Sequence, residues 1–230
     1  MFEELKAQFV LNFITDDRWM SLLRGLFVTL KITFFAVILG FVLGFSVAIV
    51  RNVYENTKKL KILNFICNVY LTVIRGTPVV VQLLIIYFVI FSSIRIDKSI
   101  AAILAFGINS GAYQAEIFRS GINSIPKGQM EAGRSLGFSY AQTMVNIIMP
   151  QAIKNVLPTL GNEFIVLMKE TSVAGYIALE DLTKAGDVIR SRTYSAMMPF
   201  LAVALLYLIM VMFFTYLLKL FEGRLAISGR

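Results

Sequence analysis

The chain is dominated by apolar runs that are too long for a water-soluble core and are separated by short polar segments. Hydrophobic residues make up 57% of its 230 residues, charged residues make up 16%, and the mean hydropathy is +0.74. A helix needs about 20 mostly apolar residues to cross the hydrocarbon core of a bilayer. The runs therefore predict a multi-pass, all-α membrane protein. The net charge of +8 indicates basic loops at a membrane surface and no nucleic-acid partner.

Five transmembrane helices account for most of the chain. Their predicted ranges are 22–50, 62–91, 100–118, 153–173 and 197–218. The fourth is the least hydrophobic, because it contains Asn162, Glu163 and Lys169, so a hydropathy scan undervalues it. In the third, Gly107 and Gly111 have the GxxxG spacing that permits close helix packing.

The region before the first span predicts an amphipathic segment at the membrane surface, residues 1–20, ahead of a membrane domain at 21–222. With the amino terminus outside, the inner segments hold eleven Lys and Arg against eight in the outer segments. The outer segments also hold eight acids against three inside. This bias favours an external amino terminus and a cytoplasmic carboxyl terminus, with a short tail at 223–230.

Several kinds of chemistry are excluded by the residues that the chain lacks. It has no histidine, no GxxxxGK[ST] run and one cysteine, Cys67. Histidine-based catalysis, a nucleotide-binding P-loop and a disulfide framework are therefore excluded. An intramembrane enzyme would also need a convergent Ser, Asp or metal cluster, which the sequence does not indicate. We predict that the chain performs no bond chemistry and itself binds no metal or cofactor.

A polar, glycine-punctuated segment at residues 125–150 lies between the third and fourth spans. Its first part predicts a helix of about two turns, because Glu131 complements the positive helix start and Gly137 can provide a left-handed cap. Ala132 and Gly133 lack bulk, so one face of this helix could lie close against another surface.

A second helix is predicted directly after the first. Ser139 and Gln142 have the spacing of a capping box, and Pro150 is expected to end this helix. A membrane protein that presents such short, capped helices to water presents them to a soluble partner. The alternative is an ordinary amphipathic loop helix that rests on the membrane.

Four stretches of the chain carry a family resemblance. Glu131 to Gly133, followed by Gly137 and Pro150, is similar to the EAA signature of bacterial ABC importer permeases, with Gly133 where many members carry a second alanine. The similarity extends to RGTPVVVQ (75–82), AYQAEIFRSGINSIPKGQ (112–129) and LPTLGNEFIVLMKETSV (157–173). Over about residues 20–222 the chain resembles the polar amino-acid uptake branch of the type I importers, whose permeases have a MetI-like architecture.

The resemblance implies a permease subunit in the bacterial cytoplasmic membrane that imports polar amino acids. Its expected partners are a second permease, identical or paralogous, two ATPase subunits that bind ATP and Mg, and an extracytoplasmic solute-binding protein. A coupling helix within the loop 120–150 would enter a cleft of the ATPase. The residues implied for that contact are Lys127, Gly128, Gln129, Glu131, Ala132, Gly133, Arg134, Leu136 and Gly137.

Polar residues inside the predicted spans mark a substrate pathway, because a charge in a bilayer costs about 2.5–3.5 kcal/mol or more unless it is paired or hydrated. An amino acid needs donors for its carboxylate and acceptors for its ammonium group. Breaks at Gly76, Pro78, Pro158 and Gly161 are expected to free backbone groups for that role. The pathway candidates are Arg75, Thr77, Gln82, Glu116, Asn162, Glu163 and Lys169.

Two alternatives concern the acids. Glu163 could form a structural ion pair with Arg75 or Lys31, and Glu116 could satisfy a helix-packing network near Arg119. A different class of function is a transporter or channel driven by an ion gradient, with Glu116 and Glu163 as titrating carriers. That class needs no ATPase, and it assigns no function to the helix near residues 129–137.

Overall fold

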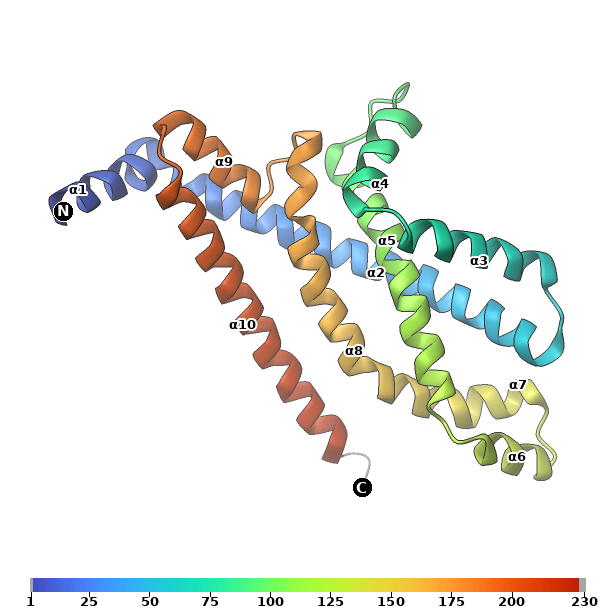
Figure 1. Ribbon diagram of the computed structural model, residues 1–230. Helices are drawn as coiled ribbons and strands as arrows, with labels where there is room; N and C mark the ends of the chain where they lie inside the picture. Colours follow the sequence, from blue (N-terminus) through green and yellow to red (C-terminus); the bar gives the residue numbers. More distant parts are fainter. Residues whose placement is uncertain (1, 228–230) are drawn as a thin grey trace.

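The computed structural model describes residues 2–227, and every regular element in that range is a helix (Figure 1). The predicted all-α fold is confirmed. Short 3-10 and π-helical stretches join some of the α-helices. The α-helices are α1 (Phe2–Phe9), α2 (Trp19–Thr57), α3 (Lys61–Arg75), α4 (Val79–Ile85), α5 (Lys98–Asn123), α6 (Lys127–Ser135), α7 (Tyr140–Thr143), α8 (Met149–Glu170), α9 (Leu182–Thr193) and α10 (Met197–Ile227).

The long helix α2 runs through the molecule and makes its largest helix–helix contact with α5. Helices α1 and α9 lie at one end, together with the start of α10, and α6, α7 and the end of α10 lie toward the other (Figure 1). Among the described residues, α2 and α10 are each long and apolar enough to cross a membrane, and the bent pair α3–α4 would be a third span. Helices α5 and α8, of 26 and 22 residues, are about 39 and 33 Å long and more polar. The count of five spans stays a prediction.

The predicted second span is not one straight helix. Helices α3 and α4, the latter continued by a π-helical turn to Ile90, meet at an angle of 109°. Gly76 ends α3, and Pro78, which is extended, precedes α4. The side-chain amide of Gln82 holds the bend, since its Nε2 donates to the carbonyl oxygens of Ile74 at 2.7 Å and Thr77 at 3.0 Å.

The predicted end of a helix at Pro150 is wrong. Helix α7, the π-helical stretch Met144–Ile148 and α8 follow one another without interruption, and Pro150 lies in the first turn of α8. The expected breaks at Pro158 and Gly161 are also wrong, because α8 continues through both. Gly161 instead gives room to the side chain of Leu218 on α10. Pro158 removes one backbone donor, but α8 packs on both α5 and α10, and these contacts support the helix through the proline.

Glycines on both helices allow the close contact of α2 with α5. Gly107 packs on Leu39, and Gly111 lies against Leu43 and the Tyr70 hydroxyl, which confirms the close packing predicted for this pair. Gly44 makes the matching contact from α2, where a Cβ would lie 2.8 Å from the backbone oxygen of Gly111. Gly40 and Gly44 have the same GxxxG spacing, GFVLG, which the sequence showed but our prediction did not use.

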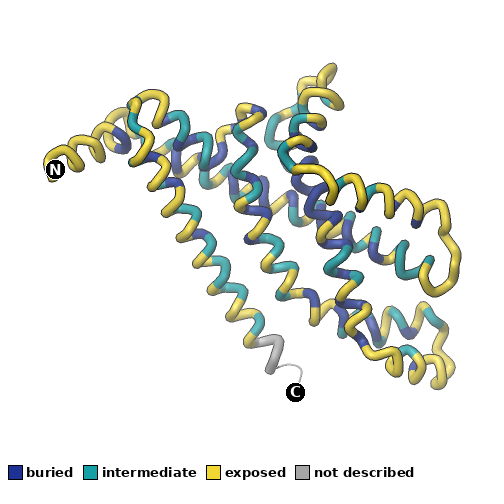
Figure 2. Tube along the Cα trace, viewed as in Figure 1, coloured by how far each residue is buried: buried dark blue, intermediate teal, exposed yellow. Residues whose placement is uncertain are grey.

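Many of the exposed positions, drawn yellow in Figure 2, carry large apolar side chains. Exposed side chains include Phe27 and Phe34 on α2, Phe65 on α3 and Phe213 on α10. The interior contains small, branched and aromatic side chains such as Ala36, Ile32, Leu83, Leu167 and Phe106. An apolar exterior around such a core is what a bilayer requires, since lipid tails are as apolar as the core.

The amino-terminal segment is attached to the turn between α9 and α10. Asn12 is fully buried, accepts a hydrogen bond from Thr193 Oγ1 at 2.8 Å and donates to Ser195 Oγ at 3.3 Å. At the other end of the chain, α10 remains helical to Ile227, so the predicted tail begins as helix. Residues 228–230 of that tail lie outside the described residues.

We predict that Gly44→Ala destabilises the protein by about 1–3 kcal/mol, because the new methyl group would overlap the α5 backbone. Thermal unfolding of the purified protein in detergent measures the effect. Gly128→Ala is the control, since nothing lies within 4 Å of a Cβ at that position. Equal stability of the two variants would contradict the close packing described above.

Candidate functional site

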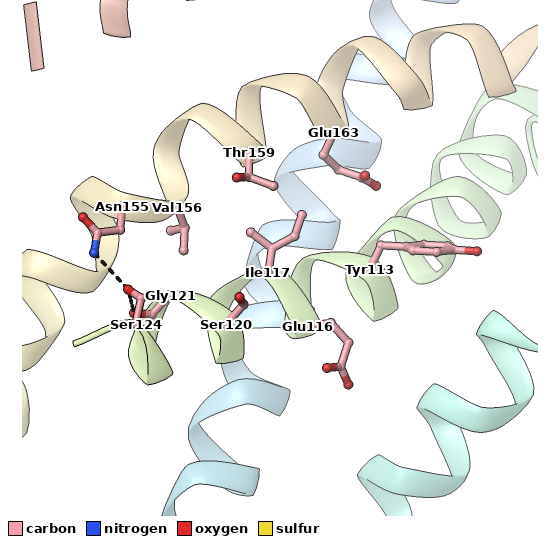
Figure 3. Close-up of a pocket in the computed structure, with 10 residues that line it drawn as sticks. All are labelled: Tyr113, Glu116, Ile117, Ser120, Gly121, Ser124, Asn155, Val156, Thr159 and Glu163. Atoms are coloured by element: carbon pink, nitrogen blue, oxygen red, sulfur yellow. Dashed lines mark hydrogen bonds between the residues drawn. The ribbon is translucent and has the colours of Figure 1, made fainter. Parts of the chain in front are cut away.

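Two neighbouring cavities share a wall formed by Tyr113 and Glu116 of α5. The larger, about 630 Å³, lies between α5 and α8 and is also lined by Glu163. The smaller, about 460 Å³, lies beside α3 and is lined by Arg51 and Arg75. In Figure 3, Glu163 reaches from α8 toward the side of Tyr113, whereas Glu116 points away from α8. The two predicted acids therefore lie on the same cavity system but face different surroundings.

Glu116 is surrounded by arginines. Its Oε1 lies 2.6 Å from Arg51 Nη1 and 3.6 Å from Arg75 Nη1, and its Oε2 lies 3.1 Å from Arg119 Nε. Arg119 also lies 3.9 Å from Glu55 on α2. The network ties α2, α3 and α5 together, as the helix-packing alternative for Glu116 predicted. Breaking such a network leaves charges unpaired, so its first role is to hold this end of the cavities in place.

Arg75 is the most available member of that network. Its side chain is 45% exposed, and its contact with Glu116 is longer than that of Arg51. The guanidinium lies 5.8 Å from the centre of the Tyr113 ring, a cation–π distance. Because Arg51 already pairs with Glu116, Arg75 can turn its donors toward a carboxylate in the smaller cavity.

Glu163 has a different environment, because no ion pair to it occurs among the described residues. Ser110 donates a hydrogen bond to its Oε1 at 3.0 Å. The predicted structural pairing of Glu163 with Arg75 or Lys31 is therefore wrong. Arg75 is held toward Glu116, and Lys31 is exposed on the outside of α2. A carboxylate that lines a cavity and lacks a cation is suited to receive one from a ligand.

The other pathway candidates lie elsewhere. Gln82 is buried and its amide is engaged at the α3–α4 bend, where Thr77 Oγ1 accepts one of its hydrogen bonds at 2.9 Å. Asn109 completes this group by donating to Gln82 Oε1 at 3.0 Å. Asn162 and Lys169 are exposed on α8 and line neither cavity. Of the seven candidates, the structure brings Arg75, Glu116 and Glu163 to the cavities.

Helices α6 and α7 form a hairpin beyond the end of α5. The predicted capping box is confirmed, since Ser139 Oγ accepts from the Gln142 backbone and the Gln142 side chain accepts from Ser139 N. Gly137 has a positive φ of 88°, as its predicted role at the end of the first helix requires. Eight of the nine residues predicted to contact an ATPase are exposed, and Leu136 is 77% exposed.

Gly133 is the exception, because the surface against which it lies close belongs to this chain and not to a partner. It is buried, and its missing side chain gives room to Thr143 of α7 and to Ile147. The small residue in the EAA-like run therefore closes the hairpin on itself. The exposed face of α6 is carried instead by Glu131, Ala132 and Arg134.

The hairpin is joined to the cavity wall by a short polar connection. Tyr140 of α7 donates a hydrogen bond to Asn52 Oδ1 at 2.6 Å, and Asn52 follows Arg51, the closest partner of Glu116. Burial, with a contribution from Glu55, raises the pKa of Tyr140, so its hydroxyl keeps the proton that it donates.

Sequence reasoning missed Arg51, Asn52 and Tyr140, because they are distant in sequence from the residues that they contact. It also missed Ser110 and Gln114, although both occupy the same stretch as Gly107 and Gly111. Four residues separate Ser110 from Gln114, so they share a face of α5. That spacing was the sequence signal that could have identified Ser110 and Gln114 as a pair.

Comparisons with known proteins agree with this architecture. Residues 36–227 match the family described as "Binding-protein-dependent transport system inner membrane component". A putative glutamine transport system permease protein of Rickettsia typhi is 38% identical over 209 residues, which cover 90% of this chain and 94% of that protein. An arginine transport system permease protein of Bacillus subtilis is 36% identical, covering 89% of this chain and 92% of that protein.

Solved structures give the same result. A crystal structure of an amino acid ABC transporter with histidines is similar with a TM-score of 0.83 and 41% identity, over 92% of this chain and 98% of that one. An inward-facing methionine ABC transporter has a TM-score of 0.77 at 21% identity, over 90% and 97% of the two chains, and shows the shared fold. The predicted MetI-like permease fold is confirmed. The chain belongs to the family of binding-protein-dependent transport system inner membrane components.

Proposed function

We propose that this chain is the membrane-spanning permease subunit of an ABC importer for polar amino acids. The observation that carries the proposal is the likeness, over 92% of the chain, to the solved amino acid ABC transporter. The relatives named for glutamine and arginine transport support the same substrate class. In this role the chain itself performs no bond chemistry. ATP and Mg are bound and used by separate ATPase subunits.

The cavities offer complementary groups for an amino acid. Glu163 can accept hydrogen bonds from the α-ammonium group, and Arg75 can donate to the α-carboxylate. Both ligand groups are charged, so each contact is stronger than a hydrogen bond between neutral groups. Glutamine and arginine share these two groups and differ in their side chains. The permease therefore binds the α-ammonium and α-carboxylate groups, which all these amino acids share, and the solute-binding protein selects among side chains.

The α6–α7 hairpin is the contact for the ATPase. It carries exposed residues of mixed character, from Lys127 to Gly137, at the end of the molecule away from α1 and α9. The distribution of Lys and Arg along the chain supports a cytoplasmic position for this end and an external amino terminus. Closure of two ATPase subunits on bound ATP favours one of two arrangements of a permease pair and so drives alternating access.

The polar connection through Tyr140 gives the hairpin a route to the cavities. A shift of α7 moves the hydrogen bond to Asn52, at the end of α2, and with it Arg51 beside Glu116. Glu116 lines both cavities, so this shift reaches the place where the amino acid binds. The ion-gradient alternative assigned Glu116 a titrating role, whereas its three arginine contacts support a fixed ionised state.

We predict that Leu136→Glu lowers ATP-driven uptake by about tenfold or more, because it places a charge on the most exposed apolar residue of the hairpin. Uptake is measured in proteoliposomes that contain the permease, the ATPase and the binding protein. Ser135→Ala, at the exposed neighbouring position, is the matched control. Unchanged uptake and ATPase co-purification by Leu136→Glu would contradict the docking role.

A second prediction concerns the ammonium contact. Glu163→Gln should weaken binding of L-glutamine or L-arginine by about tenfold or more, because a hydrogen bond to a charged group is worth about 1.5–3 kcal/mol. Binding of labelled amino acid to the purified permease–ATPase complex, without the binding protein, measures this effect. Glu170→Gln removes another acid of α8 that lines neither cavity, and it should bind as wild type. Wild-type affinity in Glu163→Gln would rule out the contact.

A further inference from the structure

We propose that Gln114 and Ser110 are positioning residues that hold the Glu163 carboxylate as an acceptor for the α-ammonium group of the amino acid. The inference rests on the proposed function and adds to it two buried residues of α5 that do not themselves line the cavities. Three observations carry it. They are a directional chain of hydrogen bonds, an unpartnered oxygen at its origin, and a pair of glycines that make room for it.

The chain of hydrogen bonds runs from α2 through α5 to α8. Gln114 Nε2 donates to the backbone oxygen of Val37 at 3.3 Å and to Ser110 Oγ at 3.0 Å. Ser110 Oγ then donates to Glu163 Oε1 at 3.0 Å. These hydrogen bonds thus connect a backbone group of α2 with Glu163, the carboxylate of these two cavities that lacks an ion-pair partner among the described residues.

The direction of this chain is fixed by its first member. The oxygen of Val37 can only accept, so the Gln114 amide must present its NH2 group on that side. The same NH2 group donates to Ser110, so the hydroxyl proton of Ser110 is free for Glu163. Glu163 Oε1 is therefore occupied by a donor from the protein. No hydrogen bond to Oε2 occurs among the described residues, and Glu163 is one of the residues that line the cavity in Figure 3.

The amide oxygen of Gln114 has no partner. Gln114 is 1% exposed, and its Oε1 makes no hydrogen bond in the part of the chain that the structure describes. A buried polar atom without a partner costs free energy, so packing alone would favour an apolar side chain here. A glutamine at this position is explained if the hydrogen bond from its NH2 group orients the Ser110 hydroxyl.

The helix contact is shaped around Gln114. A Cβ on Gly40 would lie 2.7 Å from Gln114 Nε2, and a Cβ on Gly44 would lie 2.8 Å from Gln114 Cβ. Larger residues at either position would displace the amide. Gly40 and Gly44 therefore make room for the Gln114 side chain and also allow the close approach of α2 and α5.

The test compares ligands with and without the α-ammonium group. Binding of L-glutamine and of glutaramic acid, and of L-arginine and of 5-guanidinopentanoic acid, is measured on the purified permease–ATPase complex without the binding protein. Ser110→Ala should lower the preference for the amino acid over its deaminated analogue by about three- to tenfold. A purely structural defect would weaken both ligands alike and leave the preference unchanged.

A double-mutant cycle tests whether Gln114 acts on Glu163 through Ser110. Gln114→Met keeps a similar volume and should lower the same preference, but it should add nothing in the Ser110→Ala background, since its effect passes through Ser110. Thr33→Val is the matched control, because it removes a buried hydroxyl that donates to Thr29 O and lies outside the cavities. If Gln114→Met fails to assemble, Ser110→Ala decides the question alone.

The outcomes separate the two proposals. A wild-type complex that binds neither amino acid would overturn the proposed function, and this inference with it. A wild-type complex that binds with a clear preference, together with a Ser110→Ala variant of equal preference, would overturn this inference alone. A reduced preference in Ser110→Ala with no further loss in the double variant supports it.

Discussion

The close contact of α2 with α5 is the constraint on which the rest of the structure depends. Glycines on both helices, Gly40 and Gly44 on α2 and Gly107 and Gly111 on α5, remove the side chains that would hold the backbones apart. In a membrane, where apolar surfaces gain little by leaving lipid, such packing is a main source of helix association. The same contact brings Gln114 of α5 against α2. The helix packing and the hydrogen bonds of Gln114 thus both depend on the α2–α5 interface.

Two glutamates that line the larger cavity show how surroundings give the same side chain different roles. Glu116 is held by three arginines from α2, α3 and α5, so its charge is balanced within the chain. Glu163 receives one hydrogen bond from Ser110 and has no cation beside it among the described residues. An intramembrane charge without a partner is costly. The first acid therefore fastens helices, and the second is the one that we propose accepts the positive group of a ligand.

The α6–α7 hairpin continues into α8 and packs on the end of α5 through the apolar cluster of Ile122, Ile125, Ile148 and Ala152, so it adjoins both helices that line the larger cavity. The hydrogen bond from Tyr140 to Asn52 connects the hairpin to the end of α2, next to the arginine that holds Glu116. Gly133 closes the hairpin internally, so the hairpin can move as one body. A hairpin that is packed on α5, continuous with α8 and hydrogen-bonded to α2 suits a subunit that converts motion at one end into a change of access at the other.

The sequence by itself determined the helical membrane architecture, the capped hairpin, and the family, because hydrophobic runs, capping spacings and motif residues are local patterns. It could not show that the span around Gly76 bends by 109°, where the Gln82 amide holds the bend. Nor could it show that α8 continues through Pro158, where the helix packs on α5 and α10. It named Glu163 as a site residue but left its partner open. Only the tertiary structure decided that Glu163 meets Ser110 and that Arg75 meets Glu116, because those pairs come from different helices brought together by packing.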